Sequence, residues 1–109
     1  MTASLDRIFH ALADETRRSM VKRLAKVSSC TVGELAKPYD LSLAAVSKHV
    51  KVLEDAGVVK KTRDGRTQRC RLDVRPLDRA SRKIDAYRDL WRNKLDALEL
   101  YLEREGKSR

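Results

Sequence analysis

The sequence predicts a mainly α-helical fold with one small β-hairpin. Apolar residues recur with helical spacing before and after residues 58–74, whereas this segment alternates as strands do, around Asp64-Gly65. A chain of 109 residues has room for one domain. We expect this domain to span residues 1–105 and the polar residues 106–109 to form a disordered tail.

Two short helices are expected near the N-terminus. The first carries an apolar stripe at helical spacing. Asp14 is a suitable N-cap for the second helix, which we expect from about Glu15 to Lys26. The apolar stripe of the first helix consists of Leu5, Ile8, Phe9 and Leu12.

A helix-turn-helix pair is predicted next. Thr31 and Glu34 have the spacing of a capping box, in which each side chain satisfies a backbone N–H group at the start of a helix. Ser42 is a suitable N-cap for the second helix, and Gly57 can adopt the left-handed conformation that ends it. Only a short turn around Tyr39–Leu41 separates the two helices, as is typical of this motif.

The second helix of the pair has one apolar face and one polar face. Val46, Val50 and Leu53 form a stripe that we expect to face the core. The opposite face carries small, hydroxylic and cationic groups, which suit contact with a DNA groove and its phosphates. An ordinary solvated helix surface is the alternative interpretation. The outward residues are Ala44, Ser47, Lys48 and Lys51.

The predicted hairpin favours the DNA-binding interpretation. Its strands are expected at Val58–Thr62 and Arg66–Val74, so it spans about residues 58–74. Cations concentrate near its tip, where a phosphate backbone would neutralise them. The net charge of +9, from 25 Lys plus Arg and 16 Asp plus Glu, points the same way. The cations of the hairpin are Lys60, Lys61, Arg63, Arg66 and Arg69.

A long helix should follow Pro76, from about Leu77 to Glu103. Ile84, Trp91 and Leu98 are seven residues apart and indicate a heptad-like stripe. Because a chain of this size has little core left to cover it, we expect the stripe to pair with a second copy; folding back onto its own domain is the alternative. The expected interface residues are Leu5, Ile8, Phe9, Leu12, Ile84, Tyr87, Trp91, Leu95, Leu98 and Leu102.

Three segments closely resemble the ArsR/SmtB family of bacterial winged helix-turn-helix repressors. They are ALADETRR at 11–18, TVGELA at 31–36 and VSKHVKVLEDAGVV at 46–59. The resemblance implies a homodimer built on the first and last helices, a recognition helix in the major groove, and a wing near the minor groove or backbone. By the same resemblance, the residues that face DNA are Leu43, Ala44, Ala45, Ser47, Lys48 and Lys51, with Arg63, Arg66 and Arg69 on the wing.

Many members of that family release DNA when they bind a metal, but this chain departs from their ligand patterns. The thiolate site near the helix at Thr31 needs closely spaced cysteines, and the chain offers only Cys30 there. The site on the last helix uses His and carboxylate ligands, and Leu77–Glu103 contains no His. We therefore expect no metal site and no cofactor.

Cys30 and Cys70 form a candidate redox pair. In winged-helix folds a short strand before the helix at Thr31 pairs with the wing, which would bring the two thiols together. A bond between them would fix the angle of the wing relative to the recognition helix. The alternative is that both are small buried hydrophobic residues.

The sequence therefore favours a sequence-specific transcriptional repressor that binds a palindromic operator in double-stranded DNA as a homodimer. A winged module that binds an acidic protein partner and reads no DNA sequence is the alternative. An enzyme is not expected, because no nucleophile with a base and no phosphate-binding loop can be assembled. No apolar run has membrane-spanning length and no secretory signal is present, so we expect a cytoplasmic protein; the sequence identifies no inducer.

Overall fold

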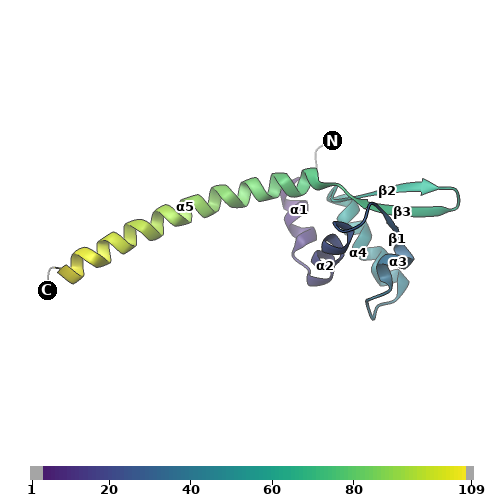
Figure 1. Ribbon diagram of the computed structural model, residues 1–109, viewed down its shortest axis with the longest axis horizontal. Coiled ribbons are helices and arrows are strands. Elements are labelled where there is room, and N and C mark those ends of the chain that lie inside the picture. Colours follow the sequence, from purple (N-terminus) through teal and green to yellow (C-terminus); the bar gives the residue numbers. More distant parts are fainter. Residues whose placement is uncertain (1–3, 108–109) are drawn as a thin grey trace.

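The computed structural model describes residues 4–107 and divides them into a head and an arm (Figure 1). The head contains the first four helices and a small sheet, and the last helix projects from it as the arm. The molecule is correspondingly elongated, with extents of 74 × 33 × 21 Å. The elements are α1 (Leu5–Leu12), α2 (Glu15–Leu24), β1 (Cys30–Thr31), α3 (Val32–Ala36), α4 (Leu43–Asp55), β2 (Val59–Asp64), β3 (Thr67–Leu72) and α5 (Val74–Lys107).

The helix starts in the head follow the capping signals of the sequence. Asp14 accepts the backbone N–H of Arg17 at 3.0 Å, and the Thr31 hydroxyl accepts that of Glu34 at 3.1 Å, completing the predicted capping box. Ser42 caps α4 in the same way. Gly57 follows α4 with a φ of 79°, the left-handed conformation expected at a helix end. Local chemistry thus accounts for where α2, α3 and α4 start and where α4 ends, whereas α2 ends at Leu24, two residues before its expected end.

The sheet is antiparallel and has the order β1-β3-β2. The predicted hairpin is confirmed, but Asp64 pairs with Thr67, so the two loop residues are Gly65 and Arg66. Gly65 has a φ of 64° and no other residue of this loop has a positive φ, as in a type II′ turn. Arg66 therefore occupies the very tip of the wing.

The core lies where α1, α2 and α4 pack against one another and the sheet. Val46, Val50 and Leu53 of α4 are fully buried in it, as their spacing predicts. Ile8 is fully buried there too, so its assignment to a dimer interface was wrong. Its side chain faces the chain's own core because α1 packs on both α4 and the start of α5. Leu5, Phe9 and Leu12 stay half-buried at the rim of the core.

Helix α5 is longer than predicted at both ends. It starts at Val74 rather than at Leu77 because the buried Asp73 carboxylate accepts the backbone N–H of Arg75 at 3.1 Å. Pro76 is tolerated in the first helical turn, where a backbone N–H lacks a helical partner in any case. At the other end, residues 106 and 107, expected in a disordered tail, belong to the helix, and 108–109 lie outside the described residues. None of the helices within 4–107 combines the length and apolar character of a membrane span.

Candidate nucleic-acid interface

Helix α4 presents an exposed face opposite its buried stripe. The sequence placed six residues of α4 at a DNA surface, and the structure leaves five of them exposed and Ala45 half-buried. Leu43 is 59% exposed, although it is apolar and stands in the first turn. The side chains are short near the start of the helix and cationic farther along. The five exposed residues are Leu43, Ala44, Ser47, Lys48 and Lys51.

Contacts from α2 hold the turn that precedes α4. The Tyr39 hydroxyl lies 2.8 Å from the Ser19 hydroxyl, and the Arg23 guanidinium stacks 5.5 Å from the centre of the Tyr39 ring. Arg23 also donates hydrogen bonds to the backbone carbonyls of Glu34 and Leu35 at the end of α3. These contacts hold the end of α3 and the turn of the motif against α2. Nothing in the local sequence pattern signalled them, because they join residues 11–20 positions apart.

A second cluster ties α4 to the first two helices. Arg17 donates to the carbonyls of Ala11 at 2.7 Å and His10 at 3.1 Å, and its guanidinium lies 3.3 Å from His49 Nδ1. Asp14 lies 3.8 Å from the same ring nitrogen. The backbone N–H of Arg17 is the main cause that lowers the pKa of the Asp14 carboxyl. His49 thus has a structural role in holding α4 against α2.

The wing arginines fall into two groups. Arg63 and Arg66 are exposed near the tip. Arg69 is half-buried, and its guanidinium donates to the Ser29 hydroxyl at 2.8 Å and to the Ser29 carbonyl at 3.2 Å. Arg69 therefore fastens β3 to the segment before β1. Its side chain is engaged within the head, unlike those of the two arginines at the tip.

The lysines of this surface also differ in their partners. Lys51 Nζ lies 3.1 Å from Asp55 one helical turn away, and this hydrogen bond is the main cause that raises the Lys51 pKa. Lys61 Nζ lies 3.8 Å from Glu54. Lys48 and Lys60 are exposed. Surface ion pairs of this kind are weak, so a DNA phosphate can compete for Lys51.

The predicted stripe of α5 lies open on the arm. Leu77 and Ala80 join the core of the head, but the six interface residues predicted farther along are each more than half exposed. Trp91 is 68% exposed. The alternative in which this stripe folds back onto its own domain is therefore wrong. The six residues are Ile84, Tyr87, Trp91, Leu95, Leu98 and Leu102, and Leu90, Leu100 and Tyr101 add to the exposed apolar surface.

Cys30 and Cys70 are directly opposite each other on β1 and β3, so the predicted proximity is confirmed. Both are buried free thiols. Burial is the main cause that raises the pKa of each, and Glu34 raises that of Cys30 further. Among residues 4–107, no three His, Cys, Asp or Glu side chains are grouped as metal ligands.

A helix-turn-helix that follows a short strand and precedes a basic hairpin paired with that strand defines the class of winged helix-turn-helix proteins. A family model described as a helix-turn-helix domain matches residues 12–62. The HTH-type transcriptional regulator Rv2034 of Mycobacterium tuberculosis is 39% identical over 103 residues, which cover 94% of this chain and 92% of that protein. The transcriptional repressor SdpR of Bacillus subtilis is 31% identical over 61 residues, which cover 56% of this chain and 67% of that protein.

Solved structures agree with these relatives. The crystal structure of an ArsR family transcriptional regulator, RHA00566, superposes with a TM-score of 0.74 at 38% identity. The match covers 81% of this chain and 96% of that one. The chain therefore belongs to the ArsR family of winged helix-turn-helix transcriptional regulators. It is a DNA-binding regulator of that type, with α4 as the second helix of its motif and β2–β3 as its wing.

Proposed function

We propose that two copies of this chain form a homodimeric repressor that binds a palindromic operator in double-stranded DNA. One observation carries the proposal: the head exposes the polar face of α4 beside a cationic wing, while the arm exposes an apolar stripe that its own chain does not cover. Two-fold symmetry would place two α4 helices about one duplex turn apart. The relative SdpR, which is named a transcriptional repressor, supports repression. The proposal contains no catalytic step and assigns no inducer.

On DNA, the start of α4 enters the major groove. Leu43, Ala44 and Ala45 are small or apolar there and suit contact with thymine methyl groups, whereas the Ser47 hydroxyl can bond to a base or a phosphate. Lys48 and Lys51 lie farther along the exposed face and contact the phosphate backbone. The sequence-reading part of the surface is thus short and weakly polar, which leaves a large share of affinity to phosphate contacts.

The wing supplies phosphate or minor-groove contacts through Arg63 and Arg66, which project from its tip. Arg69 was predicted to share this role. Its guanidinium is bound to Ser29, so we assign it instead to positioning the wing relative to β1. In this arrangement the tip of the wing contacts the duplex, and its base is held against β1.

The arm joins the two copies. Residues about 1–105 form one functional unit in this proposal, with the winged head at one end and the dimerisation helix at the other. A stable interface buries about 800 Å² on each partner, and a stripe of aromatic and aliphatic side chains over several helical turns can supply such an area. Leu5, Phe9 and Leu12, at the rim of the core near the start of the arm, extend the apolar surface.

Binding to a panel of duplexes at several salt concentrations tests this function. We expect the affinity to fall steeply with salt for every duplex and to be at least about a thousandfold higher for a selected operator than for random DNA. Replacing Arg63 and Arg66 together with alanine should shallow the salt dependence. Equal affinity for all duplexes would support a protein-interaction module instead, because its basic surface would recognise only charge.

A further inference from the structure

We propose that Cys30 and Cys70 are a peroxide-responsive thiol pair that converts to an intramolecular disulfide, which fastens the root of the wing to β1. This inference does not depend on the dimer or on the operator. It rests on the register of the sheet, on the unequal exposure of the two thiols and on the hollow beside one of them.

The strand register brings the two sulfur atoms to one face of the sheet. Cys30 pairs with Cys70, and the next pair is Thr31 with Arg69. Opposed residues of antiparallel strands have Cα atoms about 4.5–5.5 Å apart, within the range of about 4.4–6.8 Å that disulfides require. Their Cβ atoms are about 4.5–5.5 Å apart and need to approach about 4.5 Å or less. Bond formation thus requires a movement of about 1 Å at most.

The side chain of Arg69 keeps the two strands together while the thiols are reduced. Its guanidinium holds Ser29, the residue directly before Cys30, through two hydrogen bonds. Strand β1 has only two residues, so these two hydrogen bonds add to the few contacts that its pairing with β3 supplies. The disulfide would replace a noncovalent attachment at the root of the wing with a covalent one.

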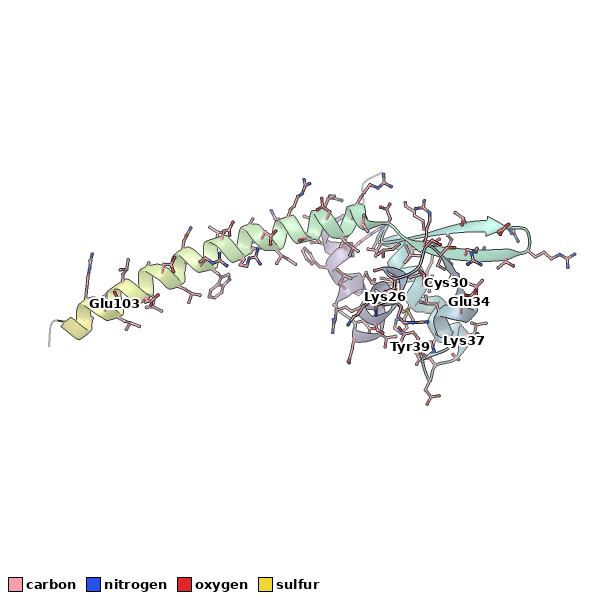
Figure 2. The ribbon with its side chains drawn as sticks, in the orientation of Figure 1. Lys26, Cys30, Glu34, Lys37, Tyr39 and Glu103 are labelled. Carbon is pink, nitrogen blue, oxygen red and sulfur yellow. The ribbon has the colours of Figure 1, made fainter. Side chains whose placement is uncertain are left out.

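The exposed edge of Cys30 opens into a hollow on the head. Cys30 is 8% exposed and Cys70 is fully buried, so a small oxidant meets Cys30 first. The hollow has a volume of about 500 Å³, and Lys26, Glu34 and Lys37 line it (Figure 2). The thiolate is the form that attacks an oxidant, and the hollow gives such a molecule access to the Cys30 sulfur rather than to that of Cys70. This arrangement assigns attack on the oxidant to Cys30 and closure of the disulfide to Cys70.

The chemistry balances with hydrogen peroxide as the oxidant. The Cys30 sulfur attacks one peroxide oxygen, the O–O bond breaks, and the departing hydroxide takes the thiol proton as water. The Cys70 sulfur then attacks the sulfenic sulfur of Cys30, the S–S bond forms, and the S–O bond breaks to release a second water. Two thiols thus lose two electrons and two protons, and one peroxide becomes two waters.

Burial of the two thiols makes this oxidation slow at neutral pH. Burial raises the pKa of Cys30 most, Glu34 raises it further, and Arg23 and Arg69 lower it. The pKa of Cys70 is also raised by burial. Cys30 and Glu54 raise the Cys70 pKa as well, whereas Lys61 lowers it. Because only the thiolate attacks, the oxidation rate should rise about tenfold per pH unit up to the raised pKa. The pair therefore responds to sustained oxidation.

The test treats the reduced full-length protein with hydrogen peroxide and follows its mass under denaturing conditions. We expect the mass of each chain to fall by two hydrogen atoms without covalent dimers, and reductant to reverse the change. The melting temperature should rise by at least about 5 °C, because the bond closes a loop that contains all of α4. Unchanged thiols, or bonds between chains, would overturn the proposal.

Serine variants separate the two roles. Cys70→Ser should accumulate a sulfenic acid on Cys30 that reacts with dimedone, and Cys30→Ser should leave Cys70 unmodified over the same time. Equal reactivity of the two variants would contradict the assigned order. Thiol mapping of the wild-type protein during partial oxidation gives the same answer without variants: a sulfenic acid on Cys30 is expected, and one on Cys70 would contradict the order.

Glu34→Gln tests whether the Glu34 carboxylate slows the oxidation of Cys30. Glutamine keeps the capping-box geometry but removes the charge that raises the Cys30 pKa. Oxidation at neutral pH should then be at least about twofold faster. Glu15→Gln, on the exposed first turn of α2, is the matched control and should leave the rate unchanged. A rate that Glu34→Gln does not change would show that this carboxylate does not control the thiol.

Discussion

The head buries its apolar side chains, whereas the arm leaves most of its apolar side chains exposed. In the head, Val46, Val50 and Leu53 of α4 are fully buried, and α4 packs against α1, α2, α3 and β2. In the arm, Trp91 and Leu102 are 68% and 60% exposed. The head is therefore a domain that can fold as one chain, whereas the arm carries an apolar surface that needs a second molecule.

The same contrast extends to the polar groups. In the head, buttressing side chains such as Arg17, Arg23 and Arg69 bond to backbone carbonyls of other elements and hold the two DNA-facing elements in place. The arm shows ion pairs within its own helix, such as Arg88 with Asp85 at 2.8 Å. Tertiary packing supplies most of the stability of a helix, so the helicity of the arm should depend on its partner. The head sets the relative positions of α4 and the wing, and the arm supplies the surface for association with a second copy.

The largest expected effect comes from breaking the arm. Trp91→Glu places a charge in the centre of the apolar stripe. Burying this carboxylate against a second copy would cost the free energy of removing it from water. We expect a monomer in sedimentation equilibrium and a loss of operator affinity of at least about a hundredfold, because the second half-site no longer contributes. The head of the monomeric variant should keep its fold.

Asn93→Glu is the matched control for this substitution. It adds the same charge two residues away, which is the opposite side of the helix. This variant should remain a dimer and bind the operator as the wild type does. A dimeric Trp91→Glu protein would show that the stripe is not the dimer interface.

A smaller effect is expected from the DNA-facing surface of the head. Lys48→Ala and Arg66→Ala should each lower affinity about tenfold for operator and random duplexes alike, and reduce the slope of log affinity against log salt by about one per protomer. Fluorescence anisotropy over a salt series measures both quantities. Arg69→Ala is the contrasting variant, which should destabilise the head while leaving the salt slope unchanged. If Arg66→Ala and Arg69→Ala reduced the slope equally, Arg69 would also contact DNA phosphates.

The smallest effect concerns the joint between head and arm. Arg75 donates to both carboxylate oxygens of Asp73, at 3.0 and 2.7 Å, and lowers the pKa of Asp73 from its ordinary value of 3.8 to about 2. A lowered pKa stabilises the fold above about pH 4, and this stabilisation is lost as the pH falls towards 2. Asn can still cap the helix but loses the charge that Arg75 stabilises, and Arg75 is itself exposed, so Asp73→Asn should lower the free energy of unfolding by about 1 kcal/mol at pH 7.

Urea unfolding of both proteins over a pH series checks this prediction. The difference between wild type and Asp73→Asn should stay constant above about pH 5 and shrink between pH 4 and 2. Arg82→Gln removes an exposed ion pair with Asp78 within the same helix and is the control. It should change stability by less than about 0.5 kcal/mol. A pH-independent difference would show that the Asp73 charge does not stabilise the joint.

Local signals in the sequence predicted most of the fold, because caps, apolar stripes and turn residues act over a few positions. The capping box at Thr31 and Glu34, the buried face of α4 and the wing were all predicted in this way. The sequence missed features that depend on distant neighbours. The bond between Arg69 and Ser29 spans 40 positions, and the direction of Ile8 depends on how α1 packs. Asp73 fell within the expected second strand, whereas it lies after β3, caps α5 and is buried.

The central claim is that a homodimer binds a palindromic operator. Selection of bound duplexes from a randomised DNA library tests it most directly, because the result depends both on recognition of DNA sequence by the head and on dimerisation through the arm. We expect the wild-type protein to enrich an inverted repeat whose two half-sites are about ten base pairs apart, centre to centre. The Trp91→Glu protein should lose the repeat and enrich at most one half-site. Enrichment of no motif, or of a single unrepeated motif by the wild-type protein, would contradict the account.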